Sequence, residues 1–220
     1  IEDNYKPINF SVPTGNFGDV YAGYLAKKIG LPINKFVVAT NQNDILHRAI
    51  ANGAYNVENV LETISPSMDI QIASNFERLI FDLNNHSDKK TIDVMKSIKE
   101  KGKYEIQKEN LDKINVDFLS SRMDENEVLN IIKTVYEKFD KVLDPHSAIG
   151  YGAFDKVDLK GNNIVLATAH PCKFPDAIEK AINIKAELPD ELLFILDEKE
   201  NYDIIDNDLN KIKQYIKERI

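Results

Sequence analysis

Residues 10–19 read Phe-Ser-Val-Pro-Thr-Gly-Asn-Phe-Gly-Asp, and they decide the fold class because they join a strand to a helix through a glycine loop. Residues 8–12 alternate apolar and polar side chains, which is typical of a short strand, and Pro13 ends that strand. From Asp19 onward, apolar side chains recur at helical spacing until the stop signal at Gly30. The sequence therefore predicts a strand, a glycine loop and a helix in succession.

The alternation of strands and helices continues beyond this unit. Residues 36–40, Phe-Val-Val-Ala-Thr, have the pattern of a buried strand, and Asn43 is the expected cap of a helix that ends at Gly53. Residues 164–169 form another apolar run that predicts a strand. Strands that alternate with helices pack as parallel sheets with helical layers. We therefore predict an α/β fold with a mostly parallel sheet flanked by helices.

Apolar periodicity and capping signals predict most of the remaining helices. They are expected over residues 75–83, 91–101, 124–139, 144–153, 175–182 and 207–220. Asp124 and Glu127 form a capping-box pattern at the start of one of them. Between residues 102 and 119 we expect a short helix followed by a strand at 116–119.

Composition excludes several classes of protein. The 220 residues include 36 acidic and 28 basic side chains, so a broad basic surface for nucleic acid or anionic membrane is not expected. Cys172 is the lone cysteine, and the apolar runs are too short to span a bilayer. These features predict a cytoplasmic protein without disulfides. Because Ile1 rather than Met comes first, we expect the chain to be part of a longer protein.

The glycine loop is a candidate phosphate site. Backbone N–H groups converge there with the positive end of a helix dipole, and glycine permits a close approach. The predicted donors are the N–H groups of Gly15, Asn16, Phe17 and Gly18 and the hydroxyl of Thr14. A tight turn without a ligand is the alternative that spacing alone leaves open. The loop has neither the ending of a Walker motif nor the third glycine of the dinucleotide fingerprint.

The stretch from Phe10 to Asp19 closely resembles the cofactor-phosphate loop of threonine synthases of the microbial and fungal type, which depend on pyridoxal phosphate. Later segments resemble the same family in the same order. They are residues 30–32, 39–44, 65–70, 74–78, 144–146 and 167–174. The resemblance covers nearly the whole chain and is vague only over residues 85–122.

This resemblance implies the C-terminal part of a pyridoxal-phosphate enzyme of fold type II, with residues 1–220 as the portion that carries the phosphate loop. The implied reaction converts O-phospho-L-homoserine and water to L-threonine and phosphate. Residues 14–18 would hold the cofactor phosphate, and Thr168 would lie beside the pyridine nitrogen. A neutral hydroxyl at that position does not enforce a charged pyridinium as a carboxylate would.

The family's Schiff-base lysine lies upstream of the glycine loop. The resemblance therefore implies that the catalytic lysine is absent from this chain, that the missing upstream half is its partner, and that the chain alone is inactive. Lys6 lies in Asn4-Tyr5-Lys6-Pro7, which does not resemble the family's lysine motif, and Lys173 is interpreted as a surface or helix-end cation.

Other polar residues leave two interpretations open. His146 and His170 either contact the substrate phosphate or site, or brace a strand–helix connection, whereas His47 and His86 are expected to be structural or solvent-facing. Cys172 is expected to be a buried small side chain. Asp69 and Arg78 either face the substrate or form ion pairs, and no metal-ligand cluster is predicted.

Two further hypotheses compete with a threonine synthase. The chain could serve as a non-catalytic phosphate-binding or interaction module derived from that enzyme, or as a pyridoxal-phosphate-dependent dehydratase or cysteine-synthase-like lyase. Fold alone does not separate these reactions. The long motifs that follow the glycine loop favour threonine synthase, because the other enzymes share mainly the loop itself.

Overall fold

The computed structural model describes residues 6–220 and contains a four-stranded sheet in the order β5-β2-β1-β6. Its strands are β1 Ile8–Pro13, β2 Ile33–Thr40, β5 Phe118–Arg122 and β6 Asn162–Val165. All three strand pairings are parallel. The predicted α/β fold with a parallel sheet is therefore confirmed. Ile1, Asn4 and Tyr5 lie outside the described residues.

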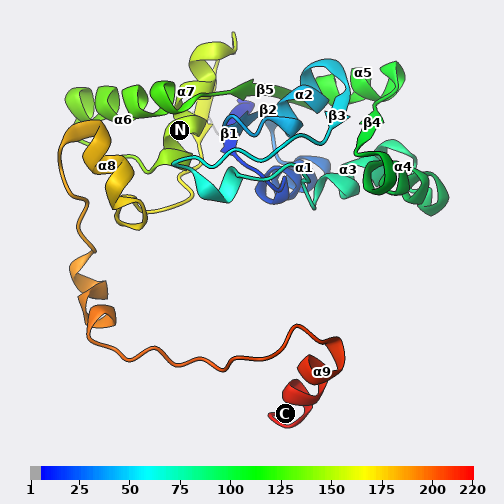
Figure 1. Ribbon diagram of the computed structural model, residues 1–220. Coiled ribbons are helices and arrows are strands. Elements are labelled where there is room, and N and C mark those ends of the chain that lie inside the picture. Colours follow the sequence, from blue (N-terminus) through cyan, green and yellow to red (C-terminus); the bar gives the residue numbers. More distant parts are fainter. Residues whose placement is uncertain (1–5) are drawn as a thin grey trace. The chain divides into compact units, whose positions relative to one another are not determined.

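Helices follow the strands of this sheet and connect them along the chain (Figure 1). They are α1 Gly18–Lys28, α2 Ile45–Asn52, α3 Phe76–Leu83, α4 Asp88–Lys101, α5 Lys108–Asp117, α6 Glu125–Phe139, α7 Pro145–Ala153 and α8 Pro175–Ile182. Strands β3 Ala54–Asn56 and β4 Lys103–Glu105 form a separate antiparallel pair. Short 3-10 turns lie at Pro66–Met68, Phe154–Lys156 and Pro171–Lys173.

The side chains of the central strand β2 point alternately to two hydrophobic cores. Phe36 and Val38 pack on one side with Phe17 of the glycine loop, in a core that also includes buried residues of α1, α2, α3, α4 and α5. Val37 and Ala39 pack on the other side, against buried residues of α6, α7 and α8. The sheet is therefore covered on both faces, as parallel sheets require.

Helix α7 lies close against β1 because Gly150 has no side chain. A Cβ at Gly150 would come within 3.0 Å of the Pro13 ring. The Ser11 hydroxyl donates to the Gly150 carbonyl over 2.6 Å. This packing fixes α7 beside the strand that leads into the glycine loop.

The structure shortens the predicted strand at 164–169 to end at Val165. Its pairing with β1 ends where the Leu166 N–H donates to the Ser11 carbonyl over 3.0 Å. The next bond of a parallel ladder would need an N–H from Pro13, which has none. The prediction that Thr168 ends a strand was therefore wrong, since Thr168 lies in the following loop.

Three other predicted boundaries also shift. The cap of α2 is Asp44, because the side chain of Asn43 instead bonds to Leu61 and Asp69. Helix α4 begins at Asp88 rather than at residue 91, because Ser87 is its N-cap and the Ser87 hydroxyl accepts from the Lys90 N–H. The strand expected at 116–119 is β5 at Phe118–Arg122, since α5 extends to Asp117.

Residues 188–220 form a compact unit separate from that of residues 6–187. This unit contains a 3-10 helix at Asp190–Leu196 and α9 at Leu209–Lys217, which Asp208 caps. The helix predicted over 207–220 is thereby confirmed with narrower bounds. Across residues 6–220, no helix combines the length and apolar character needed to cross a membrane.

Candidate functional site

The glycine loop lies at the edge of the sheet where the parallel strands end. β1 ends at Pro13, and residues 14–17 lead directly into α1. The Thr14 N–H donates to the carbonyl of Ala39, at the end of β2, over 3.0 Å. Crevices at the carboxyl ends of strands are the usual binding sites of open α/β sheets. The loop therefore occupies the position where a ligand is expected.

Internal hydrogen bonds hold the loop in one conformation. The Phe17 N–H donates to the Thr14 hydroxyl over 3.0 Å, and the Gly18 N–H donates to the Asn16 side-chain oxygen over 2.8 Å. Both of these side chains can still donate a hydrogen bond, Thr14 through its hydroxyl hydrogen and Asn16 through its amide hydrogens. Within residues 6–220, the N–H groups of Gly15 and Asn16 have no acceptor. Four donors of the loop thus remain for an anion.

Phe17 anchors the loop rather than facing a ligand. Its backbone is left-handed, with φ of 68°, and its side chain is fully buried. The ring meets Phe76 edge to face at a centroid distance of 5.2 Å and also contacts Phe118. A non-glycine residue in this conformation is uncommon, and the surrounding core has to hold it there. The loop shape is therefore set by the aromatic core beneath it.

Gly15 allows the segment at residues 65–70 to approach the loop. A Cβ at Gly15 would lie 2.9 Å from the Ser67 carbonyl oxygen and 3.0 Å from Met68 Cα. Asp69 fixes this segment, because its carboxylate accepts from Asn41, Asn43 and Thr63. Asp69 therefore has a structural role and holds one wall of the site.

A cavity of about 170 Å³ lies over the loop. Its lining residues are Pro13, Thr14, Gly15, Asn16, Asp19, Ser67, Met68, His146, Thr168, Ala169, Lys173 and Phe174. Four of the six predicted site residues, Thr14, Gly15, Asn16 and Thr168, are thus brought together. Phe17 and Gly18 do not line the cavity, and their N–H groups, which were predicted as phosphate donors, bond within the loop instead. Small-molecule pockets have typical volumes of roughly 300–1,000 Å³. This cavity has room for a phosphate group and part of a larger ligand.

A buried polar cluster at the start of α7 supports the opposite wall. Asp144 caps α7 and accepts from the backbone N–H groups of His146, over 2.9 Å, and Ser147, over 3.3 Å. It also accepts from the Ser147 hydroxyl, which in turn accepts from the Thr168 N–H over 3.2 Å. Thr168 is therefore positioned beside the cavity by a chain of hydrogen bonds that begins at Asp144.

The ionised form of Asp144 is the stable one. Burial raises the pKa of its carboxyl, but the hydrogen bonds from His146 and Ser147 outweigh burial and hold the pKa below its ordinary value. Since an ionised carboxylate only accepts, the His146 Nδ1 that lies 3.0 Å away must carry a hydrogen. His146 Nε2 is buried and has no hydrogen-bond partner among residues 6–220.

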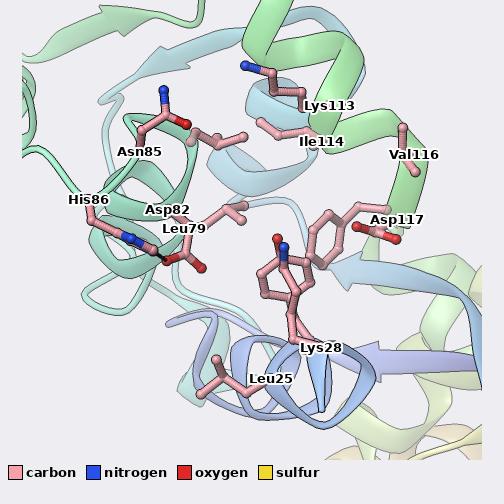
Figure 2. A pocket seen from close by; sticks show the side chains of 13 residues that line it. Leu25, Lys28, Leu79, Asp82, Asn85, His86, Lys113, Ile114, Val116 and Asp117 are labelled. Carbon is pink, nitrogen blue, oxygen red and sulfur yellow. Dashed lines mark hydrogen bonds and ion pairs between the residues drawn. The ribbon is translucent and has the colours of Figure 1, made fainter. Parts of the chain in front are cut away.

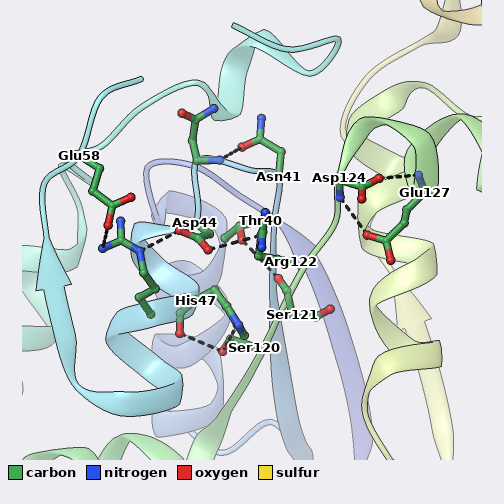
Figure 3. Close-up of polar contacts among 12 residues, drawn as sticks. Thr40, Asn41, Asp44, His47, Glu58, Ser120, Ser121, Arg122, Asp124 and Glu127 are labelled. Atoms are coloured by element: carbon green, nitrogen blue, oxygen red, sulfur yellow. Dashed lines mark hydrogen bonds and ion pairs between the residues drawn. The ribbon is translucent and has the colours of Figure 1, made fainter. Parts of the chain in front are cut away.

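Charged side chains that follow β2, together with Arg122 at the end of β5, are paired with one another (Figure 3). Asp44 contacts Arg48 at 2.8 Å and Arg122 at 3.4 Å, and Arg48 also contacts Glu58 at 3.0 Å. His47 Nδ1 lies 2.9 Å from the Ser120 hydroxyl, and partial burial lowers the pKa of His47. His47 therefore has a structural role, as expected.

A larger cavity, of about 700 Å³, lies at the opposite edge of the sheet (Figure 2). It is lined by residues at the ends of α1, α3 and α5, and by Phe118 at the start of β5. Its carboxylates already have partners, since Asp82 lies 3.1 Å from His86 and Asp117 lies 2.6 Å from Lys27. Although this cavity is larger, the chemistry of the glycine loop makes the smaller one the candidate site.

The remaining sequence-predicted residues have mixed outcomes. His170 Nδ1 accepts from the Cys172 N–H over 3.2 Å, so His170 has the capping role that was one of its two interpretations. Cys172 is half-buried, so the expectation of a buried side chain was wrong; it lies in an open turn rather than in either core. Lys173 is exposed, as a surface cation is expected to be, yet it also lines the cavity. Across residues 6–220, no cluster of side chains is suited to a metal ion.

The sequence did not predict the roles of Ser67, Met68 and Asp144 at the site. Asp144-Pro145 was recognised as the start of a helix, which is a signal for the capping carboxylate but not for its link to Thr168. The approach of Ser67 to Gly15 depends on tertiary packing and leaves no local signal in the sequence. These residues form the walls that the loop itself does not supply.

The family model and two of the curated proteins that match this chain are described as threonine synthases. Residues 147–216 match a family model described as threonine synthase, C-terminal. The threonine synthase of Pseudomonas aeruginosa is 38% identical over 96% of this chain and 46% of its own length. That of Saccharomyces cerevisiae is 38% identical over 98% of this chain and 47% of its own length. The chain therefore spans about half the length of the curated relatives that it matches.

Solved structures agree in fold. A pyridoxal-phosphate-bound threonine synthase from Brucella melitensis superposes with a TM-score of 0.88 and 41% identity, over 97% of this chain and 46% of that chain. The yeast threonine synthase superposes with a TM-score of 0.84 and 36% identity, over 99% of this chain and 48% of that chain. Both matches cover nearly all of this chain.

Proposed function

This chain belongs to the threonine synthase family, in which it corresponds to the C-terminal part, and on that premise we propose that it carries the cofactor-phosphate site of a pyridoxal-phosphate-dependent enzyme. The proposed reaction is the conversion of O-phospho-L-homoserine and water to L-threonine and phosphate. The observation that carries the proposal is the cavity over residues 14–16, where uncommitted N–H and hydroxyl donors converge at the start of α1.

The residues of the cavity fit the phosphate group of the cofactor. Gly15 leaves open the space between the loop and Ser67 that a Cβ would fill. The Thr14 hydroxyl accepts from Phe17 and therefore directs its own hydrogen elsewhere, so it can donate to a phosphate oxygen. The dipole of α1 adds favourable potential for an anion. These contacts would bind and orient the phosphate without taking part in bond breaking.

When bound, the pyridoxal group supplies the electron sink for bond breaking next to the substrate amino group. Thr168 is the residue proposed to hold the pyridine nitrogen through its hydroxyl. Its backbone N–H donates to the Ser147 hydroxyl, and Ser147 donates to Asp144, so the backbone that carries the Thr168 hydroxyl is held in place. Because the Thr168 hydroxyl is neutral, it does not favour a protonated pyridine nitrogen as a carboxylate would.

We place the lysine that bonds the cofactor outside these 220 residues. Lys173 is the one lysine among the described residues that line the cavity, and its ammonium lies 6.0 Å from the Phe174 ring centroid. Among residues 6–220, no base or carboxylate forms a hydrogen bond or an ion pair with the Lys173 ammonium, as the partner of an activated nucleophile would. The proposed partner is the remainder of the same enzyme, and a cytoplasmic location is part of the same proposal.

The test is an assay of the full-length polypeptide that contains this sequence. Purified protein with pyridoxal phosphate should release phosphate from O-phospho-L-homoserine and form threonine in equal amounts. Borohydride reduction followed by peptide mass analysis should find one modified lysine, outside residues 1–220. A binding module would show cofactor or phosphate binding with no turnover, and a dehydratase or cysteine-synthase-like lyase would act on serine, threonine or an activated serine instead.

A further inference from the structure

His146 has a buried nitrogen that the fold leaves without a partner. The side chain is 6% exposed, and Nε2 has no hydrogen bond within residues 6–220. Buried polar atoms are nearly always bonded, because an unsatisfied one lowers stability. An exception beside a cavity indicates a partner that comes from outside the chain.

The imidazole is held in a defined orientation. Its Nδ1–H donates to the Asp144 carboxylate over 3.0 Å, and its ring packs on Phe174 at a centroid distance of 4.8 Å. Asp144 is itself fixed as the cap of α7. The fold therefore specifies which nitrogen is bonded internally and which remains available.

His146 and the glycine loop line the same cavity, although they come from distant parts of the sequence. Two other charged side chains line it as well, Lys173 as a cation and Asp19 as an anion. The Asp144 carboxylate accepts from Nδ1–H of the imidazole and so leaves Nε2 as the nitrogen available to a ligand. The polar groups that converge here suit an anion with several acceptor oxygens.

We propose that His146 is a phosphate-binding residue of this cavity, which forms a hydrogen bond through Nε2 with a phosphate monoester that the glycine loop holds from the other side. Because Nδ1–H is committed to Asp144, Nε2 accepts from a P–OH group when the imidazole is neutral and donates to a phosphate oxygen when it is doubly protonated. This inference rests on the proposed function, because it takes the cavity to be a phosphate site. Asp144 acts as the positioning residue that presents Nε2.

The first test observes the histidine directly. In full-length protein labelled with 15N-histidine, the His146 ring nitrogens are followed by NMR while pyridoxal phosphate, pyridoxal or O-phospho-L-homoserine is added. We expect the Nε2 resonance to move with a phosphate ester and to stay in place with pyridoxal. A response to pyridoxal phosphate assigns the contact to the cofactor phosphate, and a response only to O-phospho-L-homoserine assigns it to the substrate phosphate. No response to either ester overturns the inference.

The second test compares two variants by equilibrium binding of the ester that moves the Nε2 resonance. His146→Asn should weaken binding about tenfold or more, because a hydrogen bond to a charged group is lost. His86→Asn is the matched control, since His86 is exposed, lies outside this cavity and has a positive φ of 60° that asparagine tolerates. It should bind as the wild type does.

The outcomes separate this inference from the proposed function. Unchanged binding by His146→Asn, in a protein whose wild type binds pyridoxal phosphate, overturns the role of His146 and leaves the cofactor site standing. A wild type that binds neither ester overturns both. If His146→Asn fails to fold, the NMR response of the wild type decides alone.

Discussion

Replacing Gly15 by alanine tests whether the loop must lie close to residues 67–68 to bind phosphate. The added Cβ would meet the Ser67 carbonyl oxygen at 2.9 Å, Met68 Cα at 3.0 Å and Ile70 Cδ1 at 3.2 Å. Two of these atoms belong to the backbone, so a side-chain rotation cannot relieve the contact. Either the loop or the segment at residues 65–70 has to move.

The contacts of the added Cβ determine how much Gly15→Ala should lower stability and phosphate affinity. Overpacking of this kind costs about 1–3 kcal/mol of folding stability. The same displacement moves the loop donors away from the phosphate, and the loss of one or two charge-assisted hydrogen bonds weakens binding about tenfold to a hundredfold. Because Gly15 does not have a positive φ, backbone strain does not add to this cost.

Gly30→Ala is the matched control. Nothing lies within 4 Å of a Cβ at Gly30, but its φ of 112° is unfavourable for alanine. It should cost about 1–3 kcal/mol through backbone strain alone. The control therefore destabilises the protein at a position far from the cavity, and it separates lost stability from lost binding.

The assay combines urea unfolding with equilibrium binding of pyridoxal phosphate and of pyridoxal to the full-length protein. The ratio of the two affinities isolates the contribution of the phosphate. We expect Gly15→Ala to reduce this ratio and Gly30→Ala to preserve it. A wild-type ratio in Gly15→Ala, or equal losses for both ligands, would refute the argument that the loop holds the phosphate.

Three further substitutions have distinct expected outcomes. Thr168→Val should preserve stability while altering the absorption of the bound cofactor and lowering turnover, and unchanged spectrum and turnover would argue against its assignment. Asp144→Asn should lower the folding stability by about 1–3 kcal/mol at neutral pH. Because folding lowers the Asp144 pKa, the stability difference between wild type and variant should be complete above about pH 4 and should shrink as pH falls through the lowered pKa. Acid unfolding of both proteins measures this difference. Asp69→Ala should cost at least about 2 kcal/mol in urea unfolding, since Asn41 and Thr63 lose their acceptor, and a loss within experimental error would contradict the structural role of Asp69.

Local signals explain why much of the fold was predictable. The start of α1, the capping box of α6 and the proline at the start of α8 depend on neighbouring residues, and the structure confirms all three. The end of β6 was not predictable from its own sequence, because it depends on Pro13 in the paired strand. Likewise, the preference of Asn43 for Leu61 and Asp69 over a capping role requires contacts that the sequence does not display.

The candidate site divides in the same way. Residues 14–18 were predictable because the loop lies between a strand and a helix with glycines at its turns, although their contact with a phosphate stays a prediction. That Thr168 lies beside this loop agrees with the resemblance and arises from the bond between Thr168 and Ser147. The unpartnered nitrogen of His146 had no signal in the sequence, because burial and hydrogen bonding are properties of the folded chain.

The central claim is that the glycine loop holds the cofactor phosphate through residues 14–16, and a crystal structure of the full-length protein with pyridoxal phosphate tests it most directly. We expect phosphate oxygens within hydrogen-bond distance of the Thr14 hydroxyl and of the N–H groups of Gly15 and Asn16, with the pyridine nitrogen next to Thr168. A cofactor phosphate bound by other residues, with this loop in its present conformation and without a ligand, would contradict the claim.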